Sequence, residues 1–343
     1  MGHLTITTLN TSAHSSLPDY TLALTATSCC MSIVGAIFIC LSYCRIAEIR
    51  NFPRKLLLYL TFADILTAFG NLMGTIRYLI LKDGEKIANN SGTIFYYAST
   101  NEVCVIQSFI TTFSSMASFF WTVVIAVYMF AAVVHPSQVF KGVRAECVYH
   151  LLSWGIPGAI TITAVALNVL GEDHSVGTGS WCWIRSDLEP RVWMLVWMVL
   201  SGKGWEILCY VTTMSLYCLL KLKIWERRTV YFSSLNSELR EEDKNFMWVW
   251  FVLYLLRIWG TIRFFVSFSA IINKSEPTRH AHFVLLNMQG VGDSGQAFWN
   301  FVIFCLCDKT VRDRITGRWR NRSESTPLLS PVVNTEAPNS VTF

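Results

Sequence analysis

The chain is poor in charge, in glycine and in proline. Charged residues are 15% of its 343 residues, against about 25% in typical soluble domains. Glycine occurs 19 times and proline 9 times, too few for a collagen-like or low-complexity chain, and 11 cysteines are too dilute for a disulfide scaffold. With 52% hydrophobic residues and a mean hydropathy of +0.41, the composition instead predicts a multispanning membrane protein.

Seven long apolar runs fit this prediction, because a helix that crosses a hydrocarbon core of about 30 Å needs roughly 20 residues. The runs contain few or no charges and lack the alternation of apolar and polar residues that marks a membrane barrel. They span residues 20–44, 56–81, 103–134, 147–170, 192–220, 246–272 and 283–306. We therefore expect an all-α membrane protein, a seven-transmembrane helix bundle over residues 20–306.

Positive charge predicts the orientation of this bundle, because Lys and Arg are retained on the cytoplasmic side. The segments on one side of the runs hold 18 Lys and Arg residues, and those on the other side hold 6. This bias places the N-terminus outside, with residues 1–19 as a short extracellular tail, and the C-terminus inside. Three Asn-x-Ser/Thr sites, at Asn10, Asn89 and Asn273, then lie outside and are expected to be glycosylated.

The segment after the seventh run has a different pattern. Residues 307–320 alternate charge with apolar residues at helical spacing, which predicts an amphipathic helix on the inner membrane surface. Residues 321–343 contain many Ser, Thr and Pro residues and are expected to form a disordered cytoplasmic tail. Phosphorylation of this tail would add the charge that arrestin recognises. The net charge of +5 comes from basic residues near the membrane, so we expect it to bind anionic lipid headgroups and not nucleic acid.

Two cysteines are expected on the oxidising side of the membrane. Cys104 lies at the outer end of the third run, and Cys182 lies in the loop after the fourth. A disulfide between them would tie that loop over the mouth of the bundle, and such bonds persist outside the cell. The alternative is that both remain reduced and buried.

Six ionisable side chains lie deep in the predicted spans, where each costs at least about 2.5 kcal/mol on insertion scales. They should face the bundle interior and find polar partners there: Asp64, Lys203, Glu206, Arg257, Arg263 and Asp293. Depth counted from the outer ends predicts a direct contact between Arg263 and Asp293. The same count pairs Glu206 with Arg257, and Lys203 shares Glu206 from one helical face.

Two further charges have separate expectations. Asp64 would hold a water, an ion or an amide, and Arg77 would reach the outer lipid headgroups. Two interpretations of the intramembrane charges are open. They form either a static polar contact that fixes helix register, or a network whose pairings differ between inactive and active states.

Six short motifs carry a family resemblance: residues 118–122 (SFFWT), 153–155 (SWG), 181–184 (WCWI), 202–206 (GKGWE), 257–259 (RIW) and 263–264 (RF). Together they make residues 20–320 similar to an orphan branch of the G-protein-coupled receptors, near the slime-mould cyclic-AMP receptors and the secretin-like receptors. The resemblance implies a multi-pass receptor of the plasma membrane with an unknown extracellular ligand and a heterotrimeric G protein as partners. It implies no enzymatic activity and no cofactor or metal. The chain lacks the Asp-Arg-Tyr and Asn-Pro-x-x-Tyr motifs of rhodopsin-like receptors.

The resemblance also suggests where the two partners bind. A ligand would lie between the outer halves of the third, fifth, sixth and seventh spans, near Trp121, Trp205, Trp259 and Asp293. A G protein would insert its C-terminal helix into an inner cavity lined by basic residues. These residues flank the fifth and sixth spans: Lys221, Lys223, Arg227, Arg228, Arg240 and Lys244.

A transporter is the main alternative, because intramembrane charges also form ion and substrate paths. The chain shows no internal repeat of the kind found in many transporters. The seven histidines lie in loops, tails or near a helix end, so they do not predict a zinc hydrolase centre. The seventh run contains no lysine for a retinal Schiff base. The sequence therefore favours a receptor.

Overall fold

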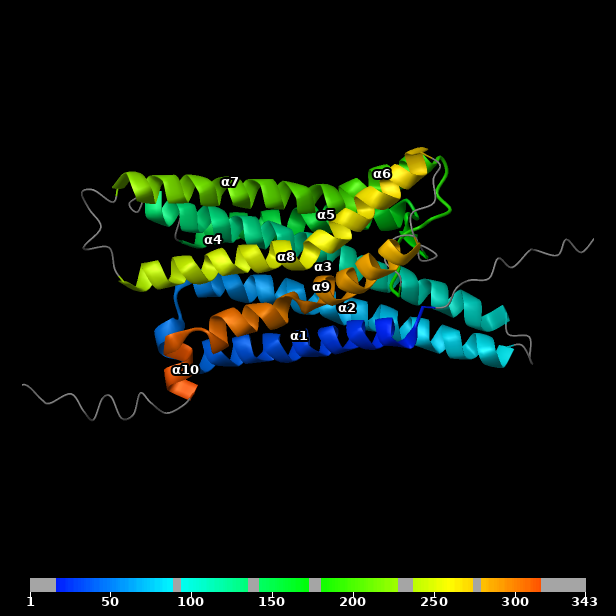
Figure 1. Ribbon diagram of the computed structural model, residues 1–343, viewed down its shortest axis with the longest axis horizontal. Coiled ribbons are helices and arrows are strands. Elements are labelled where there is room, and N and C mark those ends of the chain that lie inside the picture. Colours follow the sequence, from blue (N-terminus) through cyan, green and yellow to red (C-terminus); the bar gives the residue numbers. More distant parts are fainter. Residues whose placement is uncertain are drawn as a thin grey trace, which may run out of the picture.

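The structure is a computed structural model that describes residues 17–88, 94–134, 142–172, 180–227, 237–273 and 279–315. Its long helices run along a common axis and form one bundle (Figure 1). The helical segments, long and short, are in chain order α1 (Asp19–Arg45), η1 (Ala47–Ile49), α2 (Phe52–Ala88), α3 (Ile94–Val134), α4 (Val143–His150), η3 (Leu151–Gly155), α5 (Ile156–Ala166), α6 (Arg191–Met198), η4 (Val199–Lys203), α7 (Gly204–Arg227), α8 (Ser237–Asn273), α9 (Arg279–Phe301), η5 (Val302–Leu306) and α10 (Lys309–Ile315).

Every predicted apolar run lies almost wholly within helix, so the expectation of a helical multispanning protein is confirmed. Three runs continue through a π-helical turn, which joins α4 to α5, joins α6 to α7, and extends α9. Within the part of the chain that the structure describes, six of the resulting rods are long and apolar enough to cross a membrane. The rod formed by α9 and η5 is less apolar than these six. It packs against α1, α2 and α8.

One end of the bundle carries a short hairpin, and we refer to it as the hairpin end. Strand β1 (Leu170–Gly171) pairs antiparallel with β2 (Trp183–Ile184). The predicted disulfide is confirmed: Cys104 of α3 is bonded to Cys182, next to β2, with their Cα atoms 5.6 Å apart. The loop after α5 is therefore fixed covalently to α3, ten residues from the start of that helix.

The opposite end carries α10, which lies at the left in Figure 1. We refer to it as the α10 end. Val311 of α10 is fully buried and packs with Ile39, Ile46 and Cys305, at the end of α1 and in η5. The helix predicted over 307–320 is thus described for Lys309–Ile315. The glycosylation sites Asn10 and Asn89, the basic residue Arg228 and the predicted tail 321–343 lie outside the described residues, as does most of the 1–19 segment.

Candidate functional site

A cavity lies within the bundle, below the hairpin end, and we call it the central cavity. Its walls come from α2, α3, η4, α7, α8 and α9. The π-turn η4 and the start of α7 bring Lys203 and Glu206 to it, with 7% and 3% of each residue exposed. Arg257 of α8 and Asp293 of α9 also line it. Four of the six predicted intramembrane charges therefore meet at this one cavity.

The hairpin loop covers the central cavity through Trp181, which is wedged between helices. A Cβ on Gly74 of α2 would lie only 2.5 Å from the Cβ of Trp181, so this close approach requires glycine. The backbone N–H of Cys182 donates to Gln107 Oε1 at 2.7 Å, and Ser108 Oγ donates to the carbonyl oxygen of Trp183 at 2.8 Å. Both hydrogen bonds join the loop to α3, so the loop is held over the cavity by hydrogen bonds as well as by the disulfide.

Arg77 also holds this loop, which corrects its predicted role. We expected it to reach the lipid headgroups, but it is only 9% exposed. Its Nη2 lies 2.5 Å from Glu172 Oε2, and its Nη1 lies 3.3 Å from Cys182 Sγ. Glu172, whose carboxylate pairs with Arg77, lies just after β1, and the sequence does not reveal the path of this loop.

Glu206 is the most heavily bonded charge at the central cavity. Its Oε2 lies 2.7 Å from Lys203 Nζ, as expected from their spacing of three residues. Its Oε1 accepts from Tyr210 Oη at 2.7 Å and from Thr261 Oγ1 at 2.5 Å. Since Thr261 belongs to α8, Glu206 joins α7 to α8 in the middle of the membrane-spanning region.

Arg257 does not form the expected ion pair with Glu206. Its Nε donates to Gln296 Oε1 of α9 at 3.1 Å, and its guanidinium carbon lies 4.7 Å from the ring centre of Phe119. The depth count placed Arg257 and Glu206 at one level but could not fix which way either side chain points. Arg257 therefore contacts the amide of Gln296 and the ring of Phe119 instead of the carboxylate of Glu206.

The expected direct contact between Arg263 and Asp293 is likewise replaced by a bridge. Arg263 Nη1 donates to Gln289 Oε1 at 3.1 Å, and Gln289 Nε2 donates to Asp293 Oδ2 at 3.1 Å. Arg263 Nε donates to His282 Nε2 at 3.2 Å. Because a guanidinium can only donate, His282 Nε2 accepts this bond and carries no proton.

Asp64 binds an amide, which is one of the three partners expected for it. Its Oδ1 accepts from Ser118 Oγ at 2.7 Å and its Oδ2 from Asn300 Nδ2 at 3.1 Å. Higher in α2, Asn71 Nδ2 donates to Ser294 Oγ at 3.0 Å. The Asp64 layer connects α2 to α3 and α9, and the Asn71 layer, at the wall of the central cavity, connects α2 to α9.

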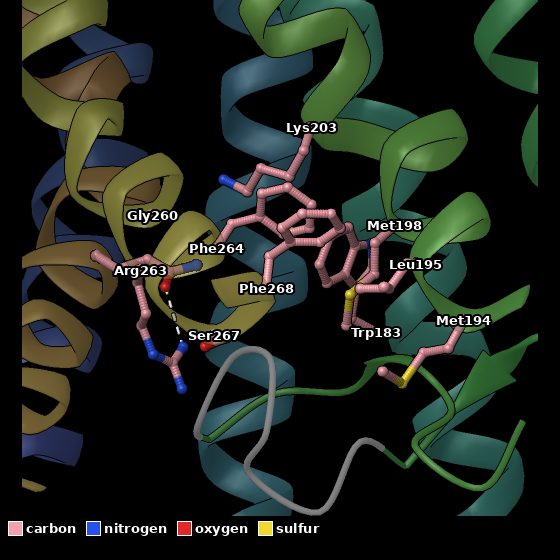
Figure 2. A pocket seen from close by; sticks show the side chains of 11 residues that line it. Trp183, Met194, Leu195, Met198, Lys203, Gly260, Arg263, Phe264, Ser267 and Phe268 are labelled. Carbon is pink, nitrogen blue, oxygen red and sulfur yellow. Dashed lines mark hydrogen bonds between the residues drawn. The ribbon is translucent and has the colours of Figure 1, made fainter. Parts of the chain in front are cut away.

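A second cavity adjoins the first, and we call it the side cavity (Figure 2). The two share Trp183, Lys203 and Gln289 as lining residues. Figure 2 shows the rings of Phe264 and Phe268 close to Trp183 and Met198, with the amine of Lys203 and the guanidinium of Arg263 to one side. The side cavity is thus apolar at one end and cationic at the other.

Comparison with known proteins gives these contacts their context. The family model described as "7 transmembrane receptor (Secretin family)" matches residues 20–202. The chain belongs to this receptor family. It is 32% identical over 301 residues to G-protein coupled receptor 157 of Rattus norvegicus, which covers 84% of this chain and 82% of the relative. It is 32% identical over 297 residues to that of Homo sapiens, covering 84% and 81%. Cyclic AMP receptor-like protein C of Dictyostelium discoideum is 24% identical over 266 residues, covering 75% and 64%.

The chain is therefore an orphan-type G-protein-coupled receptor, a multi-pass protein of the plasma membrane. Its family passes the signal of an extracellular ligand to a heterotrimeric G protein and is not an enzyme family. The transporter alternative is not favoured.

Of the four residues expected at the ligand pocket of the receptor, only Asp293 lines either cavity. Trp121 is fully buried in a separate apolar cluster, with its ring 4.9 Å from Tyr59. Trp205 packs against Phe120, with ring centroids 5.1 Å apart and planes tilted by 44°, and its Nε1 donates to the backbone oxygen of Leu200. Trp259, which is half-buried, lines neither of the two. These tryptophans lie on helix faces turned to neighbours or outward, which apolar runs alone do not reveal.

The sequence reading missed the residues that complete the site. Trp181 and Trp183 come from the loop, and Gln107, Gln289 and Gln296 supply amides that bond the loop or the charges. Nothing in the sequence marked out the three glutamines. The Trp-Cys-Trp block at 181–183 was the one signal that pointed to the two loop tryptophans.

At the α10 end, Arg54 joins α2 to the chain after η5. Its Nη2 lies 2.6 Å from Asp308 Oδ2, and its Nη1 donates to the carbonyl oxygen of Phe304 at 3.1 Å. Of the predicted G-protein contacts, Lys221 and Lys223 are exposed on α7. Arg227 also lies in α7, and Arg240 and Lys244 lie in α8.

Proposed function

We propose that this receptor crosses the membrane seven times, with α9 and η5 as the seventh span and the hairpin end outside. The bias in Lys and Arg between the two ends supports this orientation. So does the Cys104–Cys182 disulfide, because such bonds persist on the oxidising side. The lower hydropathy of α9 has a physical reason: Gln289, Gln296 and Asn300 are buried within the bundle rather than exposed to lipid.

The extracellular ligand binds in the central cavity. The observation that carries this proposal is the cavity itself, which is lined by charges from α7, α8 and α9 beneath a loop held by a disulfide. A pocket with a few convergent polar groups is the default ligand site of such a bundle. Asp293 is the expected pocket residue that fits this assignment; the three tryptophans do not.

In this proposal, ligand binding changes the contacts between α7, α8 and α9. The intramembrane charges then form a network whose pairings differ between inactive and active states, rather than a static polar contact. Glu206 and Thr261 join α7 to α8 at the cavity wall, and Arg257 and Gln296 join α8 to α9. A ligand that bonds to Arg257 or Glu206 competes with these contacts. It then shifts an existing equilibrium toward a state in which the α10 ends of α7 and α8 separate.

The G protein binds between those separated ends. We expect the basic residues that flank the fifth and sixth spans in the sequence to complement an amphipathic helix with acidic residues: Lys221, Lys223, Arg227, Arg228, Arg240 and Lys244. Arg54, Asp308 and α10 close the adjacent side against the inner lipid headgroups. The C-terminal segment after α10 is the place for arrestin to bind once phosphorylated.

Nucleotide exchange by purified G proteins tests this function. The full-length receptor in lipid vesicles is mixed with each class of G protein, and GTP uptake by the α-subunit is measured with and without tissue extracts. We expect receptor-dependent exchange with at least one class, which the double variant Lys221→Glu, Lys223→Glu lowers at least tenfold. Arg191→Glu, an exposed charge at the hairpin end, is the matched control. Solute uptake into the same vesicles without any exchange would show a transporter instead.

A further inference from the structure

The ligand class can be inferred from groups in the central cavity that lack partners. Arg257 is 3% exposed, and its Nη2 finds no hydrogen-bond partner among the described residues. Thr112 Oγ1, on the α3 wall of the same cavity, is also without one there. A buried donor left unpaired costs about 1–3 kcal/mol, and more when it is charged. A bound acceptor would remove this cost.

The side cavity indicates what the rest of the ligand looks like. Its wall is built from thioether, aliphatic and aromatic side chains of α6 and α8, among them Met198, Phe264 and Phe268. Its charged lining residues are Lys203 and Arg263, and none of the described residues that line it carries a carboxylate. In Figure 2 both cationic groups lie at one side of the aromatic cluster. The chemistry suits an apolar body attached to an acidic group.

We infer that the ligand is a small organic acid with an apolar body, whose acidic group binds Arg257 in the central cavity and whose body fills the side cavity. The shared wall of Trp183, Lys203 and Gln289 lets one molecule occupy both. The guanidinium offers a charge-assisted bond, roughly twice as strong as a neutral one. The inference rests on the proposed ligand site, but not on which G protein the receptor activates.

Thermal unfolding of the full-length receptor in nanodiscs of neutral lipid tests this inference without a G protein. The probes are the straight-chain carboxylates from butyrate to decanoate, the matched alcohols and the matched primary amines. We expect a saturable rise in the unfolding temperature with the acids from about six carbons upward. Alcohols and amines of the same length should give less than a third of the shift.

Variants locate the bound acid. Arg257→Met should weaken the apparent affinity for octanoate at least tenfold, because the acceptor loses its donor. Ser267→Trp, which places an indole in the side cavity, should do the same without touching Arg257. Ser269→Trp on the exposed face of α8 is the matched control and should leave the shift unchanged.

Several results would overturn the inference. These are equal shifts with alcohols and acids, shifts unchanged by both Arg257→Met and Ser267→Trp, or no shift with any acid. A shift produced by anionic phospholipid in the nanodisc, and abolished by Ser267→Trp, would keep the acidic chemistry and identify a membrane lipid as its source. Receptor-dependent nucleotide exchange that persists while the acids fail would reject the ligand class alone. Loss of exchange with every G protein would instead reject the proposed function.

Discussion

The buried pair of Lys203 and Glu206 gives the sharpest prediction about stability. Glu206→Gln removes one charge but keeps an oxygen that accepts from Tyr210 and Thr261. It leaves the ammonium of Lys203, 7% exposed, without its carboxylate. Removing one partner of a buried ion pair costs about 3–5 kcal/mol, and we expect Glu206→Gln to lower the free energy of unfolding by that amount.

The double variant Lys203→Met, Glu206→Gln separates this cause from general damage to packing. Removing both charges should restore stability to within about 1–2 kcal/mol of the native receptor, because no buried charge is then unpaired. The free energy of unfolding is measured by SDS titration of the purified receptor in mixed micelles. Asp19→Asn is a matched control: its ion pair with Lys82 is exposed on the Asp19 side and should contribute no more than about 1 kcal/mol. A double variant no more stable than Glu206→Gln alone would refute the reasoning.

Three further predictions concern the contacts that hold the helices together. Cys104→Ser opens the bond that closes a loop of 78 residues, and should cost about 4.5 kcal/mol in the chain-entropy account; cell-surface receptor number should fall sharply, and normal surface levels would contradict this. Gly292→Ala puts a Cβ against the backbone oxygen of Leu256 where α8 crosses α9, so SDS titration should show a loss of about 1–3 kcal/mol. Gly158→Ala, where a Cβ has room, is its control, and equal losses in the two would disprove the tight crossing. Arg54→Gln should cost about 1.5–3 kcal/mol by breaking the charged hydrogen bonds between α2 and the chain after η5; an unchanged unfolding midpoint would show that they contribute nothing.

The helices could be predicted from the sequence because one strong signal dictates them. In lipid, every backbone polar group must be satisfied within the segment, so a long apolar run has to be helical. The first run, 20–44, corresponds to α1 at Asp19–Arg45. The sixth run was less accurate: α8 begins at Ser237, nine residues before the predicted span. Charged residues end a span at the membrane surface, but they do not end a helix.

The site could be predicted only in part, because the depth of a residue in the bundle does not determine the direction in which its side chain points. Spacing along one helix fixes both, so Lys203 and Glu206 were paired correctly. Across helices, the count of residues fixes depth alone. Arg263 and Asp293 are indeed connected, but Gln289 lies between them, and Arg257 turns to Gln296 rather than to Glu206.

The central claim is that the hydrogen bond from Thr261 to Glu206 holds α7 and α8 together in the inactive receptor. Basal nucleotide exchange by the purified Thr261→Val variant tests it most directly, because valine keeps the shape and removes only this bond between the two helices. Thr27→Val, which removes a bond within α1 on the exposed face, is the control. We predict several-fold faster exchange for Thr261→Val at equal receptor number, and native rates for the control. Exchange by Thr261→Val within twofold of the native receptor would contradict the claim.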